Sequence, residues 1–280
     1  MNIQRKPEWL RKKVNPGDQN EMRSLLGELR LNTVCQQALC PNISECFACG
    51  QATFLILGRN CTRLCSFCNV EKTLPLPVDC DEPARVAEAV RRLKLSHVVV
   101  TSPTRDDLPD GGAALYAATV AAIRSASPPT RIELLVPDFQ GNVLSLETVV
   151  AARPDIIAHN VETVPRLYHI RNGSDYRRSL EVLRGCAEMA SDIRTKSGVM
   201  LGMGEQEAEL LQVFSDLRSV GCAYLSIGQY LAPSRKHYPV QEYVPLELFE
   251  SLRSAALEMG FSHVESGPYV RSSYHAGQYA

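Results

Sequence analysis

The chain has 280 residues, enough to bury one large core or two modest ones. Hydrophobic residues make up 45% of it and charged residues 22%, which excludes wholesale disorder and collagen-like structure. The 30 Lys and Arg residues against 31 Asp and Glu residues give a net charge of −1, without the positive excess typical of nucleic-acid-binding proteins.

The N-terminus and the apolar runs set an expectation about location. Residues 1–13 lack the apolar core and the small-residue cleavage site of a secretory signal. The apolar runs, such as residues 54–57 and 98–100, fall far short of the roughly 20 residues that a membrane helix needs. We therefore expect a cytoplasmic protein that binds neither membranes nor nucleic acid.

Cysteines are concentrated near the N-terminus, since seven of the ten lie between Cys35 and Cys68. A reducing cytosol disfavours disulfides, so metal binding becomes the main hypothesis. One grouping is a zinc ribbon built from two C-x2-C pairs, Cys46/Cys49 and Cys65/Cys68. It would leave three neighbouring cysteines without a role.

The other grouping is two triplets, Cys35-x4-Cys40-x5-Cys46 and Cys61-x3-Cys65-x2-Cys68. A cluster of four irons normally takes four cysteines, so three leave one iron open to a small molecule. The second triplet also matches the apolar stripe of a helix, but residues 60–69 are mostly weak helix formers. We favour two iron–sulfur clusters, and we expect the leftover Cys49, Cys80, Cys186 and Cys222 to be small core residues.

Beyond the cysteines, strand-like segments alternate with helical ones. The predicted strands are residues 53–57, 97–101, 132–136, 156–160, 193–201 and 224–229. The predicted helices are residues 82–95, 113–125, 146–152, 179–190, 205–220 and 246–259. This alternation is typical of βα units on a parallel sheet and predicts an α/β fold, a partial (β/α)6 barrel.

Polar residues follow several of the predicted strands. Thr101, the pair 137–138, the stretch 160–162 and Gln229 lie at the carboxyl ends, where barrel enzymes place their sites. Loop chemistry and helix capping are the alternative explanation for each one.

The second triplet resembles the signature loop of the radical S-adenosylmethionine (SAM) superfamily, including the aromatic Phe67 before its last cysteine. Within that superfamily the chain resembles the lipoyl synthase family from Pro7 to Ala276. The matching segments are CPNISEC (40–46), ATFLILG (52–58), RDDLPDGG (105–112), HNVETVPRLY (159–168) and VRSSYHA (270–276). The resemblance implies a barrel over residues 51–260, with an N-terminal extension (1–50) and a C-terminal extension (261–280) covering its open face.

The resemblance implies a transferase that inserts two sulfur atoms, at C6 and C8 of an octanoyl chain carried on a lysine. Those aliphatic C–H bonds are far too weakly acidic for a side-chain base, so a radical is the available route. A 4Fe–4S cluster on Cys61, Cys65 and Cys68 would bind SAM, and two SAM molecules would be spent per lipoyl group.

A second, auxiliary 4Fe–4S cluster would give up its sulfides to the substrate. The resemblance implies that Cys35, Cys40, Cys46 and Ser273 hold it, with Ser272 as the neighbouring alternative to Ser273. Oxygen is a harder ligand than thiolate, so the serine-bound iron would be the easiest to release. No catalytic residues beyond these cluster ligands are expected.

The family pattern also implies SAM contacts. They are Thr101, Gly111, Gly112, Asn160, Glu162, Arg177 and Lys196, with residues 198–205 behind the adenine. For Arg177 and Lys196, pairing with surface carboxylates is the alternative. This chain departs from the family at Pro103-Thr104, where an acidic residue usually precedes the RDDL segment, so the shape of that loop is in question.

The implied partners are octanoylated lipoyl domains, on the E2 subunits of 2-oxoacid dehydrogenases and the glycine-cleavage H protein, and a ferredoxin or flavodoxin as electron donor. Two alternatives stay open: a zinc-ribbon binding module, and another two-cluster radical enzyme such as a methylthiotransferase or a biotin synthase-like sulfur inserter. The first triplet and the RSSY tail are the features that argue against the latter.

Overall fold

The computed structural model describes residues 6–11, 20–274 and 276–279, and an eight-stranded sheet organises it. The order of the strands in the sheet follows the sequence, and the strands are β1 (Asn32–Thr33), β2 (Thr53–Leu55), β3 (His97–Thr101), β4 (Arg131–Leu135), β5 (Ile156–Ala158), β6 (Arg194–Leu201), β7 (Tyr224–Gln229) and β8 (His263–Gly267). Strands β2 to β8 are parallel, and β1 pairs antiparallel with β2. Because β1 and β8 are the two edges, the barrel is open.

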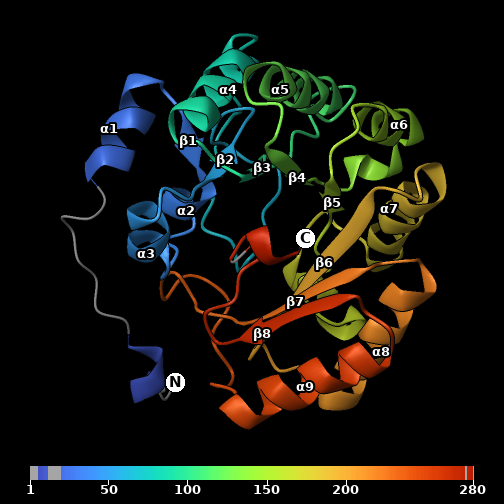
Figure 1. The fold of residues 1–280 in the computed structure, drawn as a ribbon. Coiled ribbons are helices and arrows are strands. Elements are labelled where there is room, and N and C mark those ends of the chain that lie inside the picture. The colour runs from blue at the N-terminus through green and yellow to red at the C-terminus, as the bar shows by residue number, and fades with distance from the viewer. Residues whose placement is uncertain (1–5, 12–19, 275, 280) are drawn as a thin grey trace.

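Helices cover the outside of this curved sheet (Figure 1). They are α4 (Glu82–Arg92), α5 (Ala113–Ala126), α6 (Val143–Ala151), α7 (Tyr176–Met189), α8 (Glu207–Ser219) and α9 (Leu246–Glu258). The smaller α1 (Asn20–Glu28), α2 (Val34–Gln37) and α3 (Ile43–Ala48) lie beside the open edge, next to β1. Short 3-10 helices are η1 (Glu8–Leu10), η3 (Phe139–Gly141), η4 (Pro165–Ile170) and η5 (Ala276–Gln278).

Local sequence signals explain where several helices begin. The Asp175 side chain accepts a hydrogen bond from the Arg178 backbone N–H at 2.8 Å and starts α7. Gln206 and Glu209 form a reciprocal capping box at the start of α8. The strands are buried on both faces, as in β7, where all six residues are buried, which is typical of parallel sheets.

The predicted fold class is confirmed, and the strand predictions at β3 and β7 match residue for residue. The prediction of six strands was wrong, because β8 adds a seventh parallel strand and β1 an antiparallel one. Only Val264 of β8 is buried, so this edge strand lacks the apolar run by which a strand is recognised. The short helices α1 to α3 were also missed.

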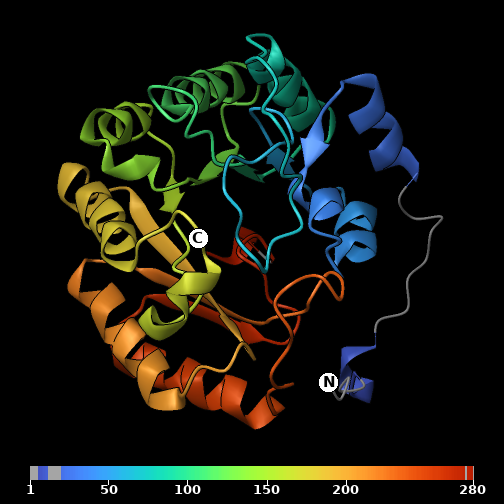
Figure 2. The same cartoon turned by 180° about the vertical axis from the view of Figure 1, so that it is seen from behind.

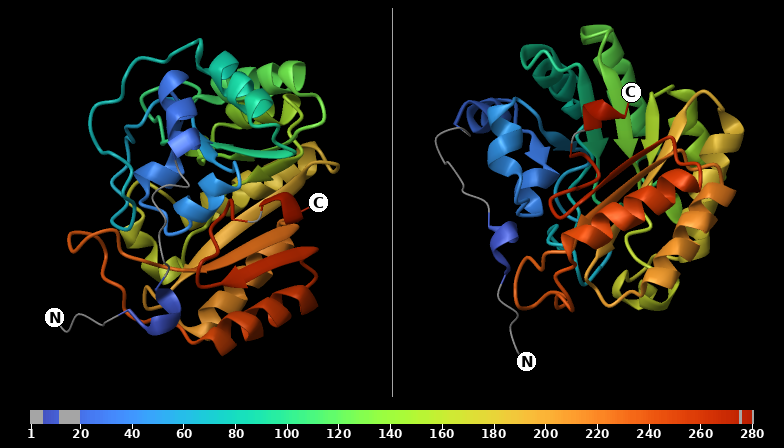
Figure 3. Two further views of the ribbon diagram at one scale, coloured as in Figure 1. Left: turned by 60° about the vertical axis from the view of Figure 1, so that its left-hand side comes forward. Right: turned by 60° about the horizontal axis from the view of Figure 1, so that its bottom comes forward.

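The C-terminal tail, residues 268–274 and 276–279, turns inward after β8. Its end lies inside the arc of strands and helices in Figures 1 and 2, and the left view of Figure 3 shows it beside the strands at one side of the molecule. Within the described residues, no helix combines the length and the apolar character needed to cross a membrane.

Candidate functional site

The loop that follows β2 carries Cys61, Cys65 and Cys68. Burial raises the pKa of the Cys68 thiol to about 12, and the nearby Cys65 and Cys61 thiols raise it further. Burial also raises the pKa of Cys65. Three partly buried cysteines on one short loop, whose thiolates would repel each other, favour a cationic group that can hold them as thiolates.

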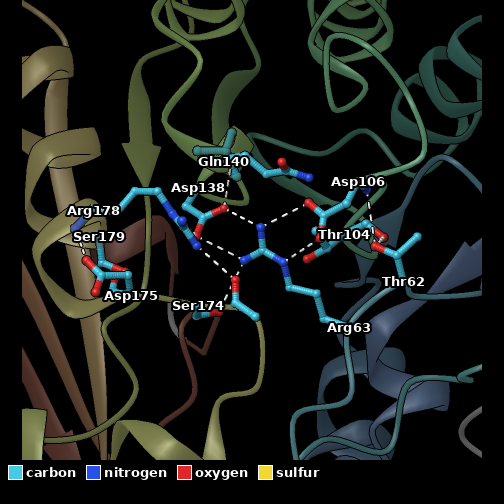
Figure 4. Close-up of polar contacts among 12 residues, drawn as sticks. Thr62, Arg63, Thr104, Asp106, Asp138, Gln140, Ser174, Asp175, Arg178 and Ser179 are labelled. Carbon is cyan, nitrogen blue, oxygen red and sulfur yellow. Dashed lines mark hydrogen bonds and ion pairs between the residues drawn. The ribbon is translucent and has the colours of Figure 1, made fainter.

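Arg63 fixes this cysteine loop to the barrel (Figure 4). Its guanidinium is bidentate to Asp106 at 2.8 and 2.9 Å and to Asp138 at 2.6 and 2.9 Å. Ser174 accepts a further hydrogen bond at 3.1 Å, and Arg178 donates at 2.8 Å to Asp138 Oδ2, which also accepts from Arg63. Arg63 is 6% exposed and Asp138 1%, so this ion-pair network is buried.

Thr62, next to Arg63, bears on the departure at Pro103-Thr104. The backbone N–H and the hydroxyl of Thr62 both donate to the Thr104 carbonyl, each at 3.0 Å. The Asp106 backbone N–H in turn donates to the Thr62 hydroxyl at 3.1 Å. Because Thr104 contributes its backbone carbonyl, these contacts do not require an acidic side chain there.

A central cavity of about 370 Å³ adjoins the cysteine loop. Cys68, Asn160, Glu162 and Gly198 are among its lining residues, as is Phe67. The Asn160 side-chain N–H donates to Glu162 at 3.2 Å, and burial raises the pKa of the Glu162 carboxyl. Glu162 has a positive φ of 65°, a backbone conformation that is uncommon for residues other than glycine.

The central cavity contains an unpaired acceptor. The Oδ1 atom of Asn160 is buried and has no hydrogen-bond partner among the described residues. An added Cβ at Gly198 would lie 2.9 Å from this atom and 2.7 Å from the Ser226 hydroxyl, so only glycine fits there. A free amide oxygen beside a carboxylate fits a ligand with an ammonium group, such as the amino-acid end of SAM.

The first cysteine triplet lines a separate auxiliary cavity of about 200 Å³. Cys35, Cys40, Cys46 and Ser273 all line it. The Thr53 hydroxyl, on β2, donates to the Ser273 hydroxyl at 2.7 Å. Three thiols and a hydroxyl facing one space fit the donor set of an iron–sulfur cluster with one oxygen ligand.

The two cavities share a wall. The residues that line both are Cys35, Cys40, Thr53, Arg271 and Ser273. Ser272 lines only the central cavity, and its hydroxyl accepts a hydrogen bond from Asn160 at 2.5 Å. Consecutive serines therefore have different partners, Ser272 toward Asn160 and Ser273 toward the first triplet. His275, the next residue but one, lies outside the described residues.

The remaining residues predicted to contact SAM do not belong to the lining of either cavity: Thr101, Gly111, Gly112, Arg177 and Lys196. The Thr101 hydroxyl donates to the Leu135 carbonyl at 2.8 Å, and Arg177 is exposed on α7. Lys196 is fully buried and ion-paired with Glu133. For these five residues SAM contact stays a prediction.

Gly111 and Gly112 both have positive φ, and here they serve packing. An added Cβ on Gly112, at a φ of 91°, would overlap the Leu57 side chain. One on Gly111 would lie 2.9 Å from the Phe139 ring. Both glycines let the loop before α5 approach its neighbours closely.

Sequence reasoning missed Arg171. Its guanidinium donates to the Tyr168 hydroxyl at 2.7 Å and to Ser179 at 3.2 Å. Its positive charge opposes the burial that raises the pKa values of Cys65 and Glu162, so it lies close to both. Arg171 directly follows η4, and its position in the sequence gives no sign that it lies near the cysteine loop.

The leftover cysteines divide into two kinds. Cys186 and Cys222 are fully buried, as predicted, whereas Cys49 and Cys80 are exposed, so that prediction was wrong for them. Cys49 ends α3 and lines the auxiliary cavity. Its zinc-ribbon partner Cys68 lines the central cavity instead, so the two C-x2-C pairs do not share one space.

No three His, Cys, Asp or Glu side chains in the described part of the chain converge on a single-ion site. In a 4Fe–4S cluster each thiolate binds a different iron, so its ligands stand farther apart than those around one ion.

Comparison with known proteins assigns the family. A model of the radical SAM superfamily matches residues 55–217. The lipoyl synthase of Geobacter metallireducens is 69% identical over 279 residues, covering 100% of this chain and 99% of the relative. The chain belongs to the lipoyl synthase family. The lipoyl synthase of Trichlorobacter lovleyi is 68% identical over 281 residues and is covered completely.

Solved structures of low identity support the fold. Methylornithine synthase has a TM-score of 0.56 at 13% identity, with 75% of this chain and 69% of that chain covered. The coproporphyrinogen III oxidase of Escherichia coli, a radical SAM enzyme, has a TM-score of 0.54 at 14% identity, with 72% and 51% covered. The predictions of a radical SAM enzyme, of lipoyl synthase, and of SAM and 4Fe–4S clusters as cofactors are confirmed.

Proposed function

We propose that this member of the lipoyl synthase family binds SAM at the central cavity and holds the sulfur to be inserted at the auxiliary cavity. Cys61, Cys65 and Cys68 would hold the SAM-binding cluster at the central cavity. Cys35, Cys40, Cys46 and Ser273 would hold the auxiliary cluster at the other. When bound, these groups supply a carbon-centred radical and the sulfur to be inserted. The observation that supports the proposal is the wall that the cavities share, since clusters held there would set the sulfur source beside the radical source.

The chain's own residues bind and orient the reactants. The buried Asn160 Oδ1 and the Glu162 carboxylate would accept hydrogen bonds from the SAM ammonium group. Gly198 and Met200, also in the lining, would let the nucleoside part lie against the β6 backbone. Arg63 would keep the cysteine loop at a fixed position over the strand ends.

The substrate chain would enter from the mouth of the central cavity. Leu39, Tyr230, Leu231 and Val270 give its lining an apolar character suited to an octanoyl chain. Leu39 is 63% exposed, so this part of the lining reaches the surface. A substrate delivered by a protein fits such an opening, and we propose the octanoylated lipoyl domains of E2 subunits and H protein as carriers.

A reduced ferredoxin or flavodoxin would supply the electron, and the cytoplasm would be the compartment. The predicted division at residues 50 and 260 belongs to the same proposal, with both extensions contributing auxiliary ligands.

Anaerobic metal analysis and a turnover assay test the assignment. We expect about eight irons per chain, and about four after alanine replaces either triplet. With dithionite, SAM and an octanoyl-lysine peptide, the intact protein should add two sulfurs, as detected by mass spectrometry. Loss of the Cys35 triplet should leave 5′-deoxyadenosine formation without sulfur gain. Unchanged iron content in either triple variant would refute the ligand assignment.

A further inference from the structure

Lys196 is the feature that the site does not explain. It lies on β6 and is 0% exposed, and it was predicted to contact SAM. Its ammonium is 3.0 and 3.3 Å from the two carboxylate oxygens of Glu133 on β4. A fully buried lysine costs several kcal/mol unless its charge is paired and its N–H groups find acceptors. Glu133 supplies the opposite charge, and other neighbours must accept the remaining N–H groups of Lys196.

Those neighbours come from the C-terminal tail. The Lys196 ammonium donates to the Ser272 backbone carbonyl at 2.6 Å. It also lies 3.6 Å from the centre of the Tyr279 ring, a cation–π contact. Two positions of the tail, 272 and 279, thus converge on one buried charge.

This geometry acts directly on Ser273. The carbonyl held by Lys196 belongs to the peptide bond that joins Ser272 to Ser273, so fixing it restricts where the Ser273 backbone can lie. Asn160 holds the Ser272 hydroxyl, and Thr53 holds the Ser273 hydroxyl. Lys196 is the one charged group among these three tethers.

Tyr279 anchors the far end of the tail. It is 1% exposed, and its ring packs against His263 at 4.6 Å and Tyr224 at 5.4 Å between centroids. Its hydroxyl is buried without a hydrogen-bond partner among the described residues, so the ring and not the hydroxyl stabilises the contact.

We propose that Lys196 is a positioning residue that holds the C-terminal tail, and with it Ser273, at the auxiliary cysteines. It acts through the tail and does not bind SAM. This inference rests on the proposed ligand role of Ser273, because only then does the position of the tail affect a cluster.

Two kinds of variant test it. In Lys196→Met/Glu133→Gln, both charges of the ion pair are removed together, and the Gln side chain keeps an oxygen for His97, whose Nε2 lies 3.4 Å from Glu133. Tyr279→Leu removes the ring contact, while Tyr279→Phe keeps the ring and loses only the unpaired hydroxyl. Arg253→Met, which removes the exposed ion pair with Glu250 on α9, is the control for loss of a positive charge.

The first measurement uses the metal-free full-length protein. Carboxypeptidase should trim the C-terminus about tenfold faster in the double variant and in Tyr279→Leu, because a tail that opens more often is cut more often. Tyr279→Phe and Arg253→Met should match the unaltered protein. Equal trimming rates in all variants would overturn the proposal.

The second measurement uses the reconstituted protein. Mössbauer spectra of the auxiliary cluster should lose the oxygen-ligated iron in the double variant, while the dissociation constant for SAM stays within about twofold. A tenfold weaker SAM affinity with a protected tail would instead make Lys196 a SAM contact. Ser273→Ala is measured in parallel: an unchanged auxiliary spectrum would refute the ligand role of Ser273, while the trimming rates would still report on Lys196.

Discussion

Arg63 and Asp138 form a buried bidentate ion pair that joins the cysteine loop to the loop between β4 and η3, at 2.6 and 2.9 Å. Asp138 also accepts from Arg178, so one carboxylate receives hydrogen bonds from two arginines. The positive charge of Arg63 holds the pKa of Asp138 far below its usual range, although burial acts in the opposite direction. The loop that carries Cys61, Cys65 and Cys68 is thereby anchored to the barrel by side chains of the protein itself.

Replacing Arg63 with Met should destabilise the metal-free protein by about 3–5 kcal/mol, because Asp138 would keep only Arg178 as a partner and the partly exposed Asp106 would lose its ion pair. Urea unfolding monitored by circular dichroism measures the change. Arg63→Lys should recover only part of the loss, since lysine cannot form the bidentate fork. Arg59→Met, which removes an exposed pair with Glu71, should have little effect. Equal midpoints for the Arg63 and Arg59 variants would contradict the anchoring role.

His159 predicts a pH dependence of stability. It is buried, with its ring nitrogens 2.9 Å from the Val136 carbonyl and 3.1 Å from the Ser179 hydroxyl, and burial lowers its pKa from 6.5 to about 4. Between these two values the unfolded chain binds a proton that the folded chain does not. Stability is therefore unaffected by this group above pH 6.5 and falls as the pH drops toward 4, by about 3 kcal/mol at most.

The dependence of the unfolding free energy on pH is measured by urea unfolding at a series of pH values, with His159→Gln as the comparison. The Gln variant should be less stable at neutral pH but should have a shallower slope between pH 4 and 6.5, because the contributions of the carboxylates are common to both proteins. Parallel slopes would show that His159 is not a buried neutral imidazole.

Alanine substitutions at Ser272 and Ser273 should affect different steps, SAM binding and sulfur transfer respectively. Ser273→Ala removes the proposed iron ligand and should slow sulfur transfer while both clusters can still assemble. Ser272→Ala removes the Asn160 hydrogen bond and should weaken SAM binding by about 0.5–1.5 kcal/mol, which equilibrium dialysis can measure. If Ser272→Ala abolishes sulfur transfer and Ser273→Ala does not, the ligand assignment moves to Ser272.

Gly112→Ala tests whether this glycine serves packing. The added Cβ would overlap Leu57 and occupy a left-handed conformation, so we expect a loss of about 1–3 kcal/mol in unfolding free energy. Gly27→Ala in α1, where an added Cβ meets nothing within 4 Å, is the matched control. SAM affinity should change little in the folded fraction. A stable variant with weak SAM binding would favour the cofactor role predicted from the family.

The sequence by itself determined the fold class, and together with the family resemblance it predicted the two 4Fe–4S clusters. The two cysteine triplets are defined by spacing along the chain, and buried parallel strands such as β3 and β7 have apolar runs that are recognisable without a partner. Strand β8 was not predicted, because an edge strand is specified by the neighbour it pairs with and not by its own residues.

Only the tertiary structure decided which residues meet. Lys196 and Ser272 are 76 residues apart, and Arg63 and Asp138 are 75 apart, so no local pattern could pair them. Both pairs form because a buried charge without a hydrogen-bonding partner would cost free energy. The partner that satisfies it is set by the fold and not by the neighbouring sequence. The same holds for Ser272 and Ser273, the two central residues of a turn that the Tyr274 backbone N–H closes on the Arg271 carbonyl at 2.9 Å. Only the fold brings Asn160 to one hydroxyl and Thr53 to the other.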